Sequence, residues 1–295
     1  MPPDTAFTRM FGCRYPLQLA GMGGFPSPEL AVAVSAAGGL GMLSGALQPR
    51  DLERQLDAVP PEVPVGVSFL MPFLDVGAAE DAAGRCALVE FFWDEPSPQL
   101  VDLVHAGGAR CSWQVGSLDE ALAAVDAGCD LVVAQGVEAG GHVRGTTPAL
   151  ELVAAVCDAI DVPVVAAGGF GDAKRIASAL GLGSAAVRVG TRFLAATESA
   201  AHPDYIDRLV GANADDTVLT TAFGIGWPDA PHRLLRSCLE AAEALGPTHA
   251  WTPDWPAADY VGDVEARPLY AGMSVDFVTK RQSAAEIVAE LMTES

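Results

Sequence analysis

The stretch DLVVAQGVEAGGHVRG, residues 130–145, decides the fold class of the chain. It begins with a short apolar run and continues into a segment where Gln135, Glu138 and His142 stand among four glycines. A continuous apolar run is typical of a strand that is buried on both faces, as in a parallel sheet. Polar residues and glycines directly after such a strand indicate a functional loop at the C-terminal edge of the sheet.

The same order, a buried strand followed by a helix, recurs along the first 190 residues. Ser27-Pro28-Glu29 and Ser117-Leu118-Asp119-Glu120 are typical helix starts, because serine caps the first turn. Eight successive βα units favour a (β/α)₈ TIM barrel of the α/β class over a doubly wound sheet. The expected strands are 15–20, 39–43, 63–70, 87–93, 109–115, 131–135, 162–167 and 185–189, and expected helices include 28–37, 49–58, 97–106, 117–127, 148–160 and 172–182.

From about residue 215 this alternation ends. The segment 249–266 contains Trp251, Trp255, Tyr260 and four acidic residues, without a lysine or arginine. Such a composition indicates an irregular cap rather than another βα unit. We therefore expect a barrel over 1–214, a cap over 215–269, and a final segment 270–295 whose helix, 283–291, packs back on the barrel.

Composition limits the classes of function. The chain has 295 residues, and 17 basic against 38 acidic side chains give a net charge of −21, which disfavours nucleic acid as a partner. Apolar runs are shorter than the ~20 residues of a membrane span, and no signal peptide is recognisable, so we expect a cytoplasmic protein. Six scattered cysteines and five histidines show neither disulfide nor metal-ligand spacing. The oligomeric state stays open, with a homodimer among the alternatives.

Two glycine-rich turns follow the expected seventh and eighth strands. They read Ala167-Gly168-Gly169 and Gly190-Thr191-Arg192. In TIM barrels a phosphate group usually binds at these two positions, where glycine N–H groups approach an anion closely. Each turn alone is equally explained by the tight turn itself, but the two together favour a phosphate site.

His142 is the candidate catalytic residue, because its loop ends the sixth strand on the same rim. Its glycine neighbours give no packing reason for an imidazole, and histidine suits proton transfer near neutral pH. Glu138 is better explained as a structural or orienting carboxylate. The stretch LAGMGG, residues 19–24, ends the first strand and offers small residues against which a flat ring can lie, although a plain βα turn explains it as well.

These motifs together resemble a known family. QGVEAGGH (135–142), AAGG (166–169) and GTRFL (190–194), supported by SPELA (27–31), GGLG (38–41) and DTVLT (216–220), are similar to the nitronate monooxygenases, formerly called 2-nitropropane dioxygenases. The resemblance covers nearly the whole chain, and the QGVEAGGH block is its most specific part.

The resemblance implies a TIM barrel with a small extra domain and a non-covalently bound FMN. It makes His142 the base that removes the acidic proton of a neutral nitroalkane, after which electrons pass through the flavin to O₂ and the products are a carbonyl compound and nitrite. Substrate would stack on the ring below cap residues such as Phe223, Trp227 or Tyr260. The implied cofactor-binding residues are Ala20, Gly21, Met22, Gly23, Ser68, Gln114, Gln135, Ala139, Gly140, Gly141, Ala167, Gly168, Gly169, Gly190 and Thr191.

Two positions depart from the family pattern. Ser68 stands in Gly66-Val67-Ser68 where relatives commonly have asparagine, so a contact with the flavin ring is lost or passes to water. Met273 replaces a glutamine near the substrate mouth. We expect flavin binding to survive both changes and substrate preference to differ.

Other functions remain open at this point. The flavin-dependent enoyl-acyl-carrier-protein reductases share the barrel and an almost identical QGxEAGGH block, but they require NADH. A different flavin oxidation, or a flavin-binding sensor without catalysis, fits the same cofactor site. A barrel that binds phosphosugars explains the two glycine turns without any flavin.

Overall fold

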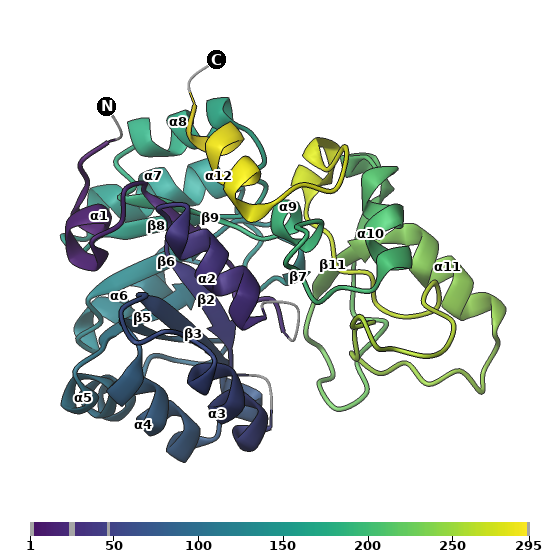
Figure 1. The fold of residues 1–295 in the computed structure, drawn as a ribbon, viewed down its shortest axis with the longest axis horizontal. Helices are drawn as coiled ribbons and strands as arrows, with labels where there is room; N and C mark the ends of the chain where they lie inside the picture. Colours follow the sequence, from purple (N-terminus) through teal and green to yellow (C-terminus); the bar gives the residue numbers. More distant parts are fainter. Residues whose placement is uncertain (1–2, 24–26, 46–47, 294–295) are drawn as a thin grey trace.

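The computed structural model describes residues 3–23, 27–45 and 48–293; Gly24, the end of the LAGMGG stretch, lies outside them. Eight parallel strands form one sheet in the order β1-β9-β8-β6-β5-β4-β3-β2, and a parallel bridge between Gln18 and Leu40 joins its two edges into a barrel (Figure 1). The predicted fold class and all eight predicted strands are therefore confirmed. The barrel strands are β1 Leu17–Leu19, β2 Gly41–Ser44, β3 Val65–Leu70, β4 Leu88–Phe92, β5 Arg110–Val115, β6 Leu131–Gln135, β8 Val164–Ala167 and β9 Ala186–Val189.

Helices alternate with the strands around the barrel. One of them, α4, was not predicted, because its sequence VGAAEDAAGR is rich in alanine and glycine and has no stripe of large apolar residues. Asp75 caps its first turn by accepting a hydrogen bond from the Ala78 amide. The barrel helices are α2 Pro28–Ala36, α3 Pro49–Asp57, α4 Val76–Arg85, α5 Pro98–Gly107, α6 Leu118–Asp126, α7 Ala149–Ala159 and α8 Ala173–Gly181, and a short α1 spans Ala6–Phe11.

The predicted helix starts form as expected at the serines. Ser27 accepts a hydrogen bond from the Leu30 amide, and Ser117 accepts one from the Glu120 amide, each at 3.2 Å. The Glu120 carboxylate does not complete a capping box, since it accepts from the Gly116 amide at 2.7 Å. Glu120 thus stabilises the turn that ends β5.

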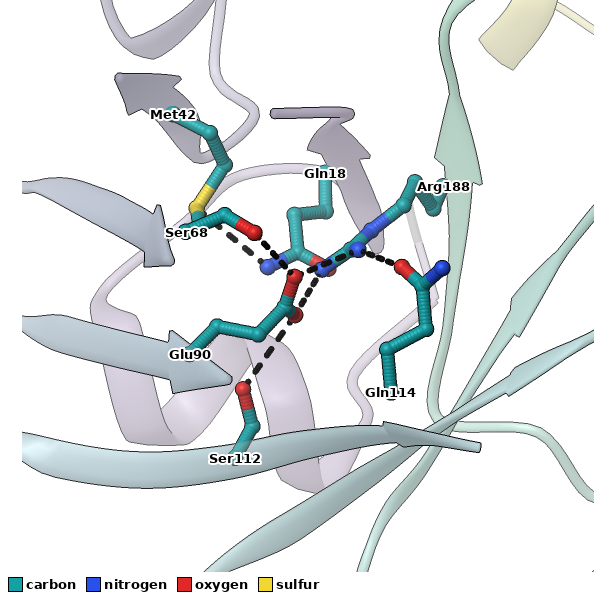
Figure 2. Close-up of polar contacts among 7 residues, drawn as sticks. All are labelled: Gln18, Met42, Ser68, Glu90, Ser112, Gln114 and Arg188. Atoms are coloured by element: carbon teal, nitrogen blue, oxygen red, sulfur yellow. Dashed lines mark hydrogen bonds and ion pairs between the residues drawn. The ribbon is translucent and has the colours of Figure 1, made fainter. Parts of the chain in front are cut away.

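The interior of the barrel is polar, which the apolar strand pattern did not predict. Glu90 of β4 and Arg188 of β9 form a buried ion pair inside it, as Figure 2 shows. TIM-barrel interiors are usually filled by branched apolar side chains. The full network comprises Gln18, Met42, Ser68, Glu90, Ser112, Gln114 and Arg188.

After β9 the chain builds a second body beside the barrel (Figure 1). A second hydrophobic core draws on residues from Leu194 to Val278, so the alternation ends earlier than residue 215. Its three-stranded antiparallel sheet has the order β10-β11-β7, and β7 belongs to the glycine loop of the barrel. The elements are β7 Gly141–His142, α9 Thr191–Leu194, α10 Pro203–Val210, β10 Thr217–Thr220, β11 His232–Leu235 and α11 Arg236–Ala244.

The C-terminal helix returns to the barrel. It is α12, Ala284–Met292, and it packs against α2 and α8. Segment 249–266, for which the sequence indicated an irregular structure, is mostly irregular. Among the described residues, no helix is long and apolar enough to cross a membrane.

Gly41 provides a test of the packing between α2 and β2. A Cβ on Gly41 would overlap the carbonyl oxygen of Ala31 in α2, whereas a Cβ on Gly84, exposed in α4, would meet nothing within 4 Å. We expect Gly41→Ala to lower the free energy of unfolding by about 1–3 kcal/mol through overpacking. Gly84→Ala should leave it unchanged or raise it by about 0.5–1 kcal/mol. Urea denaturation measures both, and equal effects of the two substitutions would contradict the described packing.

Candidate active site

A cavity of about 340 Å³ lies at the C-terminal ends of the barrel strands. Gln114 ends β5 on its wall, Gln135 ends β6, Ala167 ends β8, and Gly190 follows β9. His142 and every residue that the sequence analysis assigned to cofactor binding line this cavity. Their binding roles stay predictions, but parallel strands do bring them together as expected.

Close approach of neighbouring backbone requires glycine at two positions in the loop after β6. A Cβ on Gly136 would overlap the backbone of Ala149, and one on Gly140 would overlap the Gly272 amide. Glu138 accepts a hydrogen bond from the Ala149 amide at 2.8 Å and pairs with Arg175 at 2.6 Å. The carboxylate therefore holds the start of α7 and the side of α8, which agrees with its predicted structural role.

Gln135 determines where His142 lies. Its side-chain amide donates to the carbonyl oxygen of His142 at 3.0 Å, so the two ends of the loop are tied together. His142 then pairs with His232 in the register of β7 and β11. Because its backbone belongs to this sheet, the imidazole is held by the second body and reaches the cavity from above the strand ends.

Aromatic rings surround the imidazole of His142. The indole of Trp227 stacks on it, with ring centroids 3.9 Å apart and planes inclined by 23°. Trp93 meets it edge-on at 5.9 Å, and Tyr270 lies at the same distance. Trp93 has a φ of 81°, a left-handed backbone conformation that is uncommon outside glycine and often marks functional sites.

Electrostatics keep His142 neutral. Burial, and to a smaller extent the nearby His232, together lower its pKa from 6.5 to about 3. Burial also lowers the pKa of His232, whose Nδ1 lies 3.0 Å from the carbonyl oxygen of Ala230. At neutral pH the His142 ring therefore has a free lone pair with which to accept a proton.

The two glycine turns lie together at another part of the wall. Gly168 and Gly169 have φ values of 105° and 74°, conformations that favour glycine. The Thr191 hydroxyl oxygen accepts from the Gly272 amide at 3.0 Å, which leaves its proton for a ligand. The Asp172 carboxylate caps α8 by accepting from the Arg175 amide at 2.7 Å, so one of the free amides at the start of this helix already has a partner.

The cap residues that were expected near the substrate lie in different environments. Trp227 lies on the cavity wall, whereas Phe223 is buried in the second core and Tyr260 packs under Arg267. Met273, 38% exposed, is not on the wall, although its neighbour Ser274 is. The lining residues that sequence reasoning missed include Phe73, Phe92, Arg188, Trp255 and Tyr270, and it also missed Trp93, which contacts the His142 ring.

Comparison with known proteins identifies the family. A family profile described as nitronate monooxygenase matches residues 4–78 and 74–294. The chain belongs to the nitronate monooxygenase family. It is 33% identical to the nitronate monooxygenase npaC of Metarhizium robertsii, over 89% of this chain and 86% of that protein.

Solved structures agree with this family. The nitroalkane oxidase of Streptomyces ansochromogenes is 28% identical with a TM-score of 0.80, and each chain is covered to 97%. FabK of Thermotoga maritima is also 28% identical, with a TM-score of 0.84 over 98% of this chain and 95% of that one. Family membership makes the chain an oxidoreductase and points to a flavin as the group that the cavity holds.

The residues on the wall fit a flavin. The volume lies in the range of small-molecule and cofactor sites, about 300–1,000 Å³. Gly141 has a φ of 69°, and a Cβ there would meet nothing within 4 Å, so the backbone is open to a flat ring. Glycine turns and a hydroxyl proton suit a phosphate at one end, while Ser68 and Gln114 supply polar contacts at the floor.

The low pKa of His142 predicts its titration. We expect its C2 proton resonance, assigned by its loss in His142→Asn, to stay at the neutral position from pH 8 down to pH 5. Folded-state protonation should begin only near pH 4, because burial opposes the charged form. Proton NMR of the histidines measures this, and a midpoint close to 6.5 would show that the ring is solvated instead.

Proposed function

We propose that this protein uses FMN to oxidise nitronates and neutral nitroalkanes with O₂, giving a carbonyl compound and nitrite. The observation that carries the proposal is the neutral imidazole of His142, held over the cavity in a chain of the nitronate monooxygenase family. A carbon acid of neutral charge needs a base that is unprotonated at working pH. His142 satisfies that requirement.

The wall divides into two parts for the cofactor. Gly168, Gly169, Gly190 and Thr191 would hold the phosphate, and Met22, Gln114 and Gly141 are among the residues beside the isoalloxazine. Bound there, FMN supplies the electron transfer between substrate and O₂. The backbone and side chains of the protein provide the binding, the orientation and the exclusion of water.

His142 performs the proton transfer in this scheme. Its neutral ring accepts the α-proton of the nitroalkane, and the nitronate that forms stabilises the imidazolium by its opposite charge. Trp227 covers one face of the ring, but the nitrogen lone pair that accepts the proton lies in the ring plane, so the stacking does not block the transfer. Because Gln135 bonds the backbone of His142 rather than its ring, the ring nitrogens stay available for this transfer.

The role of His142 predicts a split between two substrates. We expect His142→Asn to lower kcat/KM for neutral nitroethane by about 10²–10⁴-fold, the usual contribution of a positioned base. Turnover of preformed propyl nitronate should change by no more than a few-fold, because its proton has already left. Steady-state nitrite production measures both, with flavin absorbance as a check on cofactor content. An equal loss on the two substrates would show that His142 positions substrate instead.

A flavin-dependent enoyl reductase is the second candidate, favoured by the likeness to FabK. Anaerobic reduction of the flavin, followed by visible absorbance, separates the two. We expect propyl nitronate to bleach the flavin and NADH to leave it oxidised, because the proposed reaction needs no nicotinamide. Bleaching by NADH alone would overturn the oxidase proposal in favour of a reductase, and a colourless protein would overturn both.

A further inference from the structure

The ion pair inside the barrel uses all its hydrogen-bonding capacity. Arg188 carries five N–H groups, and its Nε and Nη2 donate to Gln18, its Nη1 and Nη2 to Glu90, and its Nη1 also to Gln114 at 2.5 Å. Glu90 accepts these two bonds and two more, from Ser68 at 2.9 Å and Ser112 at 3.3 Å. The pair is nearly inaccessible to solvent and has no donor left for a ligand.

The ion pair of Arg188 and Glu90 determines which hydrogen-bonding groups two neighbouring wall residues present to the cavity. Arg188 can only donate, so it fixes the Gln114 amide with its oxygen toward the guanidinium and its NH₂ group on the other side (Figure 2). Ser68 gives its single proton to Glu90, so its oxygen can act only as an acceptor toward other partners. Both residues line the cavity, which therefore meets one acceptor and one donor at its floor.

We propose that Arg188 and Glu90 are positioning residues that set Ser68 as acceptor and Gln114 as donor for the imide edge of the flavin. That edge carries an N–H donor between carbonyl acceptors, so it needs both kinds of partner. The inference rests on the proposed flavin site. It also explains why Ser68 needs Glu90: the hydrogen bond to the carboxylate fixes the serine hydroxyl as an acceptor toward the cavity.

A double substitution separates positioning from stability. Arg188→Met with Glu90→Met removes both charges together, and such replacements of buried ion pairs by apolar residues often leave stability intact. We expect a folded protein by circular dichroism that releases FMN about ten-fold more readily on dilution, followed by the fluorescence of free FMN. Arg110→Met is the matched control, since Arg110 pairs with Asp130 at the opposite end of β5. It should leave FMN affinity unchanged.

The energetic coupling between Gln114 and the ion pair, measured as FMN affinity, tests whether the pair positions the Gln114 amide. Gln114→Met should weaken FMN binding in the wild-type chain but add little in the double variant, where its amide is no longer oriented. The same loss in both backgrounds, or wild-type affinity in the folded double variant, would overturn the inference. A wild-type chain without flavin would instead overturn the proposed function, and the inference with it.

A further variant, Gln114→Glu, tests the inference even if the double variant does not fold. Glutamate still accepts the hydrogen bond of Arg188, so the network inside the barrel is retained, but it has no N–H to offer the cavity. We expect unchanged secondary structure and FMN affinity at least ten-fold weaker. Retained affinity would show that the Gln114 amide does not donate to the ring.

Discussion

The buried contact between Arg188 and Glu90 is the interaction on which the cavity floor depends. It crosses the barrel from β9 to β4, and its partners bring in β1, β3 and β5. Removing one charge would leave the other buried without compensation, which typically costs about 3–5 kcal/mol. The two residues therefore constrain each other, and they constrain the polar face that a ligand meets.

The loop after β6 connects this floor with the proton-transfer group above it. Its glycines let it pass close to α7 and to the 271–272 segment, and its last residues join the sheet of the second body. Arg233 of that sheet donates to the carbonyl oxygen of Val137 at 2.9 Å. The cavity floor thus belongs to the barrel and His142 to the sheet of the second body. The loop after β6 fixes the distance between them.

Much of this arrangement could be predicted from local sequence. Continuous apolar runs located the eight strands, and the end of a parallel strand located His142, Gln135 and the glycine turns, because strand ends share one rim. The ion pair could not be predicted in this way, since Glu90 and Arg188 are 98 positions apart and each stands singly among apolar neighbours. Nor could β7, a strand of two residues, or the left-handed turn that places Trp93, because both depend on partners distant in sequence.

The return of α12 to the barrel has a consequence for how the chain folds. This helix packs between α2 and α8, so residues 284–292 complete a layer that begins at residue 28. Contacts of such long sequence separation form slowly, because the intervening chain must first be ordered. Until α12 has been made, the side of α2 that it covers stays exposed, and incompletely packed intermediates of this kind are prone to aggregate.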